Sequence, residues 1–149
     1  MKLAGLIIIC MLGMPEIFYG QSLYDAKGNV IATKISENRL NVTGSVFAME
    51  NGRMINILDG QRREDLGVNY SLREGGRIHY FNTHDEFTGY YIPSENRFYR
   101  VDAKRGEDNH IALLYEGQVY TLNENPTFKI DNGFDPELIG YVLFFFLGY

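Results

Sequence analysis

From residue 21 onward, short runs of apolar and aromatic residues alternate with polar stretches that contain Gly and Asn. Branched and aromatic side chains pack well on a pleated surface, so runs of this length and composition are typical of β-strands. The strand candidates are Leu23-Tyr24 and the longer runs 30–35, 40–42, 46–49, 54–58, 68–72, 78–81, 88–92, 98–101, 110–115 and 119–122. The pattern therefore predicts an all-β protein.

Two-residue turns separate these runs in pairs, and each turn is followed by an Arg or Gln and then an apolar residue. The turns are Glu37-Asn38, Asn51-Gly52, Gly75-Gly76, Glu95-Asn96 and Glu116-Gly117. Asn-Gly and Gly-Gly suit a tight hairpin because a type I′ turn needs positive φ at both central positions. The residues that follow the turns (39, 53, 77, 97 and 118) are 14, 24, 20 and 21 positions apart. Repeated hairpins bury their apolar faces by stacking or closing radially, so we predict a radially arranged or closed array of antiparallel β-hairpins.

The C-terminal segment differs from the repeats because it is apolar on every side. Leu138 to Tyr149 has the sequence LIGYVLFFFLGY, and Asp135-Pro136-Glu137 before it has the residues favoured at a helix start. We predict a short apolar C-terminal helix, with a buried strand as the alternative because Val, Tyr and Phe also favour strands. A segment apolar all round must be buried in the core or in an interface. Leu138 to Tyr149 is therefore also a candidate interface for a homo-oligomer.

The N-terminus has the pattern of a secretory signal peptide. Lys2 is followed by an uncharged apolar run over residues 3–14. A helix of that length is too short for the roughly 30 Å hydrocarbon core of a membrane, but it matches the apolar region of a signal peptide. Gly20 is small enough for the position before the cleaved bond, so we predict a signal peptide over 1–20 with cleavage between Gly20 and Gln21. The protein is therefore expected to be exported to the periplasm, the cell surface or the medium.

Removal of the signal peptide leaves a single predicted domain over 21–149 without a cysteine, because Cys10 is the only one in the chain. Disulfides, thiolate catalysis and cysteine-based metal sites are thereby excluded from that domain. The net charge is −5 with both signs interspersed, whereas non-specific nucleic-acid binding needs a basic patch. We expect no nucleic-acid partner and, after signal removal, no transmembrane helix.

Two polar segments contain residue types that ligate metals, but in no standard metal-binding spacing. His79, His84, Asp85 and Glu86 form the densest group, and His with carboxylate would suit zinc. We interpret this group as a polar strand face followed by a solvated loop. Residues 102–109 contain three acids but lack the alternating ligands of a calcium-binding EF-hand loop. The sequence therefore predicts no catalytic, cofactor-binding or metal-ligating residue.

Aromatic residues flank the turn at residues 95–96. Alternation along the strands directs some of the rings of Tyr90, Tyr91 and Tyr99 to the outer face. Exposed rings on a rigid sheet stack on sugars or anchor protein partners, although ordinary core packing and cross-strand pairing are the alternative. Tyr90, Tyr91 and Tyr99 are our candidate residues for binding an unknown protein or glycan.

Three features together resemble the 4-fold beta flower proteins, which are small exported bacterial proteins. The chain opens with Leu-Tyr-Asp-x-x-Gly-x-Val-Ile-Ala over Leu23 to Ala32, continues with repeated hairpins, and closes with the apolar segment Asp135 to Phe146. The resemblance implies hairpins arranged around a pseudo-four-fold axis, whereas the chain contains five turn signals. It implies no known activity, so no functional residue is carried over.

Three functional hypotheses follow. The first is an exported, non-enzymatic module for binding or for a role in the cell envelope, because no catalytic constellation is present. The second is a small exported hydrolase with a carboxylate- or His-based site. The third is a small outer-membrane β-barrel, although the predicted strands are shorter than the about 9–11 residues that such a barrel needs.

Overall fold

The computed structural model describes residues 20–102, 104, 107–121, 128–131 and 134–149. Except for Gly20, the predicted signal peptide lies outside these residues, as does part of the loop at 102–109. The strands are β1 (Gln21–Tyr24), β2 (Val30–Ser36), β3 (Arg39–Val42), β4 (Ser45–Glu50), β5 (Arg53–Leu58), β6 (Gln61–Arg63), β7 (Asn69–Glu74), β8 (Arg77–Phe81), β9 (Phe87–Ile92), β10 (Arg97–Asp102), β11 (Glu107–Tyr115), β12 (Gln118–Thr121) and β13 (Phe128–Ile130). The helices are the one-turn η2 (Glu64–Leu66) and the C-terminal α2 (Pro136–Phe145).

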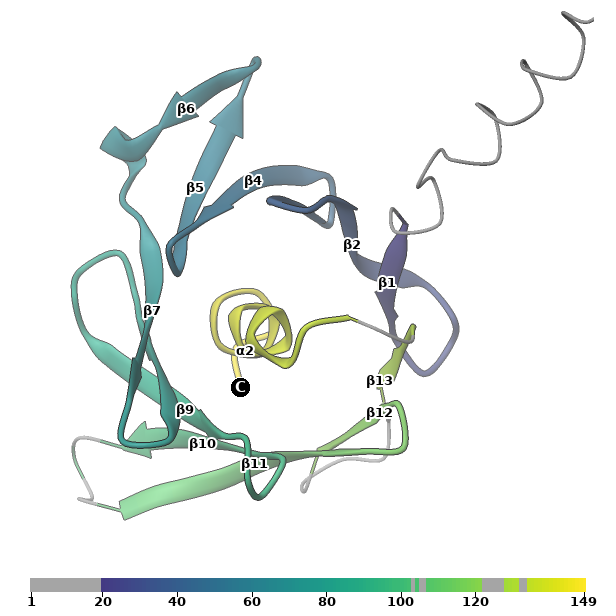
Figure 1. Cartoon of the computed structure of the whole chain (residues 1–149), viewed down its shortest axis with the longest axis vertical. Coiled ribbons are helices and arrows are strands. Elements are labelled where there is room, and N and C mark those ends of the chain that lie inside the picture. The colour runs from purple at the N-terminus through teal and green to yellow at the C-terminus, as the bar shows by residue number, and fades with distance from the viewer. Residues whose placement is uncertain (1–19, 103, 105–106, 122–127, 132–133) are drawn as a thin grey trace, which may run out of the picture.

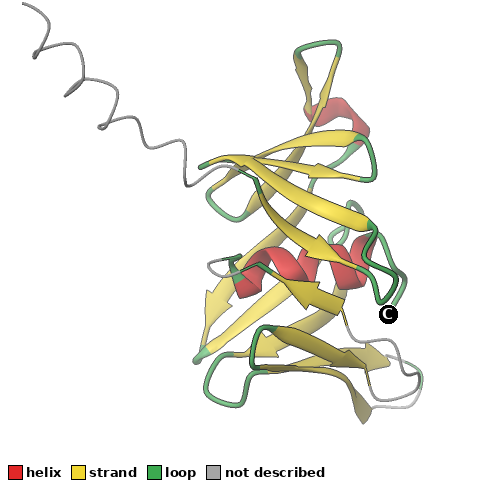
Figure 2. Cartoon of the chain, turned by 90° about the vertical axis from the view of Figure 1, so that its right-hand side faces the viewer, coloured by secondary structure: helices red, strands yellow, loops and turns green. Residues whose placement is uncertain are grey.

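Twelve of the strands form a closed antiparallel barrel. Hydrogen-bonded neighbours follow the order β4-β3-β2-β1-β13-β12-β11-β10-β9-β8-β7-β5, and the pairing of β4 with β5 closes the ring (Figure 1). β6 extends this sheet only beside β5, and the β5–β6 hairpin projects from the barrel (Figure 2). The closed array of antiparallel hairpins predicted from the sequence is confirmed.

The tight turns have the backbone conformation that their residues favour. Both residues have positive φ in Asn51-Gly52, Gly75-Gly76 and Glu116-Gly117, as a type I′ turn requires. The sequence reading missed the same conformation at Thr43-Gly44 between β3 and β4. There the side chain of Asn41 accepts a hydrogen bond from the Gly44 amide at 3.0 Å. This additional turn explains why the first two turn signals are closer together than the others.

The helix α2 lies at the centre of the barrel, with strands on every side in the view along its axis (Figure 1). Asp135 caps its N-terminus, because the Asp135 carboxylate accepts a hydrogen bond from the Glu137 amide at 2.9 Å. Residues 139–144 of the helix are all buried. The inward side chains of the strands that join the helix in one core are Leu23, Ile31, Ala32, Leu40, Val42, Phe47, Met54, Ile78, Tyr80, Tyr91, Phe98, Ala112, Val119 and Phe128. The predicted helix is confirmed, and it is apolar all round because the barrel surrounds it.

Two glycines allow the helix and the strands to approach closely. A methyl group at Gly140 of α2 would overlap the ring of Tyr80, and one at Gly89 of β9 would overlap the ring of Phe144. Protein cores are packed as densely as organic crystals, so both positions exclude any side chain.

The apolar C-terminal segment packs within its own barrel. Leu138, Phe145, Phe146, Leu147 and Tyr149 are partly buried against the same core as the fully buried helix residues. The segment therefore has its apolar contacts without a second subunit, and a homo-oligomer through it stays a prediction. Among the described helices, none combines the length and the apolar composition that crossing a membrane requires.

Candidate functional site

Seven aromatic rings form a continuous group on the outer surface of β7 to β11, which we call the aromatic face. The strand register arranges them in two rows that cross the strands. The longer row consists of His79, Tyr90, Tyr99 and His110, and the shorter row consists of Tyr70, Phe81 and Phe87. Neighbouring strands are about 4.8 Å apart, so directly opposed rings on adjacent strands are close enough to touch.

The rings of both rows contact one another. Tyr90 and Tyr99 stack with their centroids 5.0 Å apart and their planes 14° apart. The rings of Tyr70 and Phe81 stack at 4.9 Å. The ring of Phe87 contacts Phe81 of its own row at 5.5 Å and also contacts His79 and Tyr90 of the longer row. The two rows therefore form one surface. Aromatic pairs of this kind are worth about 0.5–1.5 kcal/mol each beyond the area they bury, so the ring contacts stabilise the outer surface of the sheet.

Charged groups border the rings of the longer row. The Tyr90 hydroxyl donates to the Asp108 carboxylate at 2.7 Å, and the Tyr99 hydroxyl donates to Glu95 at 2.8 Å. The guanidinium of Arg77 lies 4.7 Å from the centroid of the Tyr90 ring, within the range of a cation–π contact. Burial, together with the hydrogen bond to Asp108, raises the pKa of Tyr90 to about 12. The aromatic face therefore combines ring surface with hydrogen-bonding groups of both charges.

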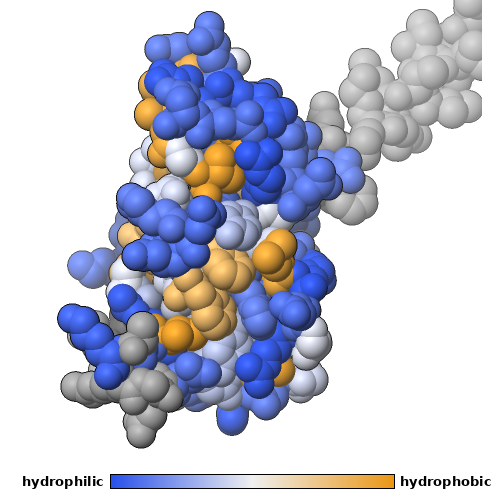
Figure 3. Space-filling view, turned by 90° about the vertical axis from the view of Figure 1, so that its left-hand side faces the viewer, coloured by the Kyte–Doolittle hydropathy of each residue, from blue (hydrophilic) through white to orange (hydrophobic). Residues whose placement is uncertain are grey.

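The aromatic face is only partly open to solvent. Phe87 is 40 % exposed, whereas Tyr90 in the middle of the longer row is 5 % exposed. Leu72 pairs with His79 and extends the longer row by one apolar side chain that is 51 % exposed. On the side of the molecule where β7 and β9 lie, apolar side chains gather in an area bordered by hydrophilic ones (Figure 3). A ligand would meet a narrow apolar strip between polar groups.

The structure separates the three tyrosines that the sequence grouped together. Tyr90 and Tyr99 lie on the aromatic face, but Tyr91 points into the barrel and is 3 % exposed. Its ring stacks on Phe98 at 4.5 Å, and its hydroxyl donates to the Asn96 side chain at 3.0 Å. The assignment of Tyr91 to a binding surface is therefore corrected, since neighbouring residues of a strand point to opposite faces.

Sequence reasoning missed most of the other rings of this face. Tyr70 and His110 are far from the turn at residues 95–96, and they join the face through the pairing of β7 with β8 and of β10 with β11. The sequence does show, from alternation along each strand, which rings share a face of that strand. It does not show which rings of different strands lie side by side, because that depends on the strand register.

The histidine and carboxylate group considered for metal binding is split between two environments. His79 lies in the aromatic face, 5.1 Å from the ring of Phe87. His84 and Glu86 lie in the turn after β8, where the Asn82 side chain accepts hydrogen bonds from both of their amides. Within the described part of the chain, no three His, Cys, Asp or Glu side chains are placed to hold a metal ion. These residues therefore offer no built metal site.

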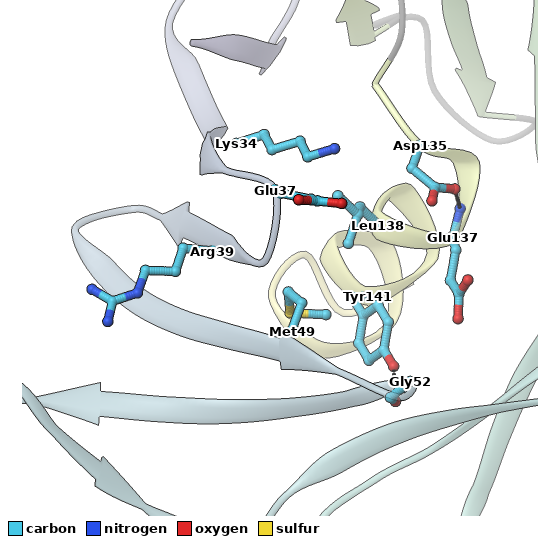
Figure 4. Close-up of a pocket in the computed structure, with 9 residues that line it drawn as sticks. All are labelled: Lys34, Glu37, Arg39, Met49, Gly52, Asp135, Glu137, Leu138 and Tyr141. Carbon is cyan, nitrogen blue, oxygen red and sulfur yellow. Dashed lines mark hydrogen bonds between the residues drawn. The ribbon is translucent and has the colours of Figure 1, made fainter. Parts of the chain in front are cut away.

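A small cavity of about 150 Å³ opens beside the start of α2. The β2–β3 hairpin, the β4–β5 hairpin and α2 supply its walls (Figure 4). The lining residues are Lys34, Glu37, Arg39, Met49, Gly52, Asp135, Glu137, Leu138 and Tyr141. The sequence did not suggest this site, because its charged residues come from segments about a hundred positions apart.

A polar network beneath this cavity ties the helix to the barrel. The Glu137 carboxylate accepts hydrogen bonds from Ser71 Oγ and from Arg73, both at 2.5 Å. The Tyr141 hydroxyl lies 3.0 Å from Ser71 Oγ and also donates to the carbonyl of Gly52. Burial raises the pKa of Tyr141, which keeps its hydroxyl protonated as a donor. Ser71 is buried and its hydroxyl is fully engaged, so the network is structural and offers no accessible nucleophile.

No protein-family model, no curated protein and no solved structure matches the chain.

Proposed function

We propose that this chain is an exported, non-enzymatic binding module and that the aromatic face of β7 to β11 binds a glycan. The observation that carries the proposal is the continuous contact of seven rings across five strands. A contiguous apolar patch that is exposed and bordered by polar groups is typical of a binding site. The rows run across the strands, so they offer an extended strip that suits a chain-like ligand.

The chemistry of the strip favours a sugar chain over a protein surface. A protein partner typically covers about 800 Å² per side with an apolar centre, but the large apolar side chains exposed on this strip are Leu72 and Phe87. A sugar presents both C–H groups, which pack on rings, and hydroxyls, which pair with charged side chains. Asp108 and Glu95 already accept hydrogen bonds from Tyr hydroxyls on the face, and charged acceptors make stronger hydrogen bonds than neutral ones.

Export is supported by the N-terminal pattern and by where the first strand begins. β1 starts at Gln21, so cleavage between Gly20 and Gln21 would leave every strand of the barrel intact. The glycans available to an exported protein are those of the cell envelope and its surroundings, which agrees with the binding role.

The binding test uses polysaccharide pull-down and a glycan array with the exported protein. Wild type is expected to bind at least one polysaccharide, and Phe87→Ser with Leu72→Ser is expected to weaken binding at least tenfold. Leu58→Ser is the matched control, because Leu58 is equally exposed at 48 % but lies on the projecting β5–β6 hairpin. Binding to no glycan, binding to a protein partner alone, or release of new sugar ends from the bound polysaccharide would each contradict the proposal.

The export test is fractionation of a bacterial host that expresses the full chain, followed by N-terminal sequencing. The protein is expected outside the cytoplasm with Gln21 as its first residue. Recovery from the cytoplasm with residues 1–20 intact, or from the outer-membrane fraction, would contradict this part of the proposal.

A further inference from the structure

The cavity beside the start of α2 has a rim of opposite charges. Lys34 comes from β2, Glu37 from the following turn, and Asp135 from the helix cap. In Figure 4 the ammonium of Lys34 points toward the carboxylate of Asp135, and the carboxylate of Glu37 lies on the same side of the cavity. Three charged groups therefore face one small space.

These rim charges form no ion pair with one another. Among the residues that the structure describes, ion pairs join other side chains, and none includes Lys34, Glu37 or Asp135. One oxygen of Asp135 accepts the amide of Glu137 at 2.9 Å, as a helix cap does. Lys34 is half-buried without a charged partner, which is unfavourable, whereas Glu37 and Asp135 are exposed at the mouth of the cavity. A ligand whose carboxylate pairs with Lys34 would therefore stabilise the site.

Two further polar residues of the lining, Glu137 and Tyr141, are already engaged, and the Arg39 guanidinium points away from the cavity (Figure 4). Glu137 accepts from Ser71 and Arg73, and Tyr141 donates to Gly52. The first turn of the helix is satisfied by the Asp135 cap and by its own backbone bonds. The selectivity of the site therefore depends on the three rim charges, and not on the helix N-terminus.

The size and the floor of the cavity limit the ligand further. A volume of about 150 Å³ is below the about 300–1,000 Å³ of pockets for drug-sized molecules, so it holds a molecule of only a few heavy atoms. Met49, Leu138 and the ring of Tyr141 form an apolar floor. A short aliphatic group would cover that floor while charged groups of the ligand reach the rim.

We propose that this cavity binds a small zwitterion of the free amino acid type. Its ammonium would lie between the carboxylates of Glu37 and Asp135, and its carboxylate would pair with Lys34. A simple cation would meet the repulsion of Lys34, and a simple anion would meet the two carboxylates, so only a ligand with both charges matches the rim. The site is separate from the aromatic face and does not rest on glycan binding.

Isothermal titration calorimetry with the exported protein tests this proposal, using alanine, glycine and serine as zwitterions and methylamine and acetate as single-charge probes. At least one amino acid is expected to bind with a Kd of about 0.1–1 mM, which corresponds to about −5 kcal/mol, and Lys34→Met is expected to weaken it at least tenfold. Arg39→Met is the matched control, because the Arg39 guanidinium points away from the cavity (Figure 4).

Three results would overturn the zwitterion site. These are no heat from any amino acid, equal affinity of wild type and Lys34→Met, and binding of methylamine or acetate as tight as that of the amino acids. Thermal unfolding of Lys34→Met verifies that the variant is folded. Its glycan binding should equal that of wild type, so failure of this site is distinguishable from failure of the proposed function.

Discussion

The hydroxyl of Tyr141 on the central helix donates a hydrogen bond to the backbone carbonyl of Gly52, 89 residues earlier in the chain. The same carbonyl accepts from the amide of Ser71 at 2.7 Å. This contact lies beside the seam between β5 and β7, where the register contains two residue pairs. β4 and β5 share five pairs. The helix therefore stabilises the barrel where β5 and β7 share few residue pairs.

Removing the Tyr141 hydroxyl is expected to destabilise the barrel. Tyr141→Phe loses the hydrogen bond to the Gly52 carbonyl and the polar contact with Ser71 Oγ. The loss of one such hydrogen bond costs about 0.5–1.5 kcal/mol in the free energy of unfolding, measured by urea denaturation. Tyr115→Phe is the matched control, since Tyr115 is 56 % exposed. An equal loss in both variants would show that the hydroxyl of Tyr141 has no special role.

Substitution of Gly140 by Ala tests the close approach of α2 to the barrel, because helix propensity and the overlap with Tyr80 change the stability in opposite directions. In an unhindered helix, Gly→Ala stabilises by about 1 kcal/mol. Here the new methyl group would overlap the ring of Tyr80, and overpacking a core costs about 1–3 kcal/mol, so Gly140→Ala is expected to lower the melting temperature. The cost should shrink in a Tyr80→Leu background. A more stable Gly140→Ala protein would contradict the close approach of helix and strand.

The side chain of Asp131, which directly follows β13, forms hydrogen bonds to β1. Its carboxylate accepts from the amide of Ser22 at 2.9 Å and from the hydroxyl of Tyr24 at 3.1 Å. Asp131→Ala leaves both donors without this acceptor, so we expect a loss of about 1–3 kcal/mol and faster hydrogen exchange at the Ser22 amide. Glu74→Ala, at an exposed strand end, serves as the control. Unchanged exchange at Ser22 in the Asp131 variant would contradict this role.

Alkaline conditions are expected to weaken the fold. The pKa of Tyr90 is about 12 in the folded protein and about 10 in an unfolded chain, so the folded state holds the phenolic proton more tightly. The stability from this difference is complete below about pH 10 and is lost as the pH rises through the folded pKa. Burial raises the pKa of Tyr80 and Tyr141 in the same direction.

The measurement is the free energy of unfolding across this alkaline range, with tyrosinate absorbance followed in parallel. Tyr90→Phe removes one titrating group and should make the loss of stability with pH less steep. An identical slope in wild type and Tyr90→Phe would mean that Tyr90 titrates alike in the folded and unfolded states.

Local patterns predicted most of the fold because they depend on neighbouring residues. The runs 54–58 and 78–81 became β5 and β8, since their composition and the turns beside them both favour hairpins. β6 and β13 were missed, because each is three residues long and is a strand only through pairing with a partner. Asp135-Pro136 correctly marked the start of α2, since a helix cap is a local feature.

The candidate sites depended far more on tertiary structure. Alternation along β9 predicts opposite directions for Tyr90 and Tyr91, but it does not say which of the two points outward. That choice followed from packing Tyr91 against the core inside the barrel. The cavity rim exists because Lys34 and Asp135 lie near each other in the folded chain. No local sequence pattern relates two residues so far apart in the chain.

The sequence by itself determined that the chain forms antiparallel hairpins and ends in an apolar segment that must be buried, because strand composition, turn chemistry and helix capping act over a few residues. Only the tertiary structure decided that the hairpins close around α2. Closure sets the register between strands from distant parts of the chain, and that register aligns the rings of Tyr70, Tyr90 and His110 on one face. It also places the N-terminus of the helix beside Lys34 and Glu37, which creates the cavity.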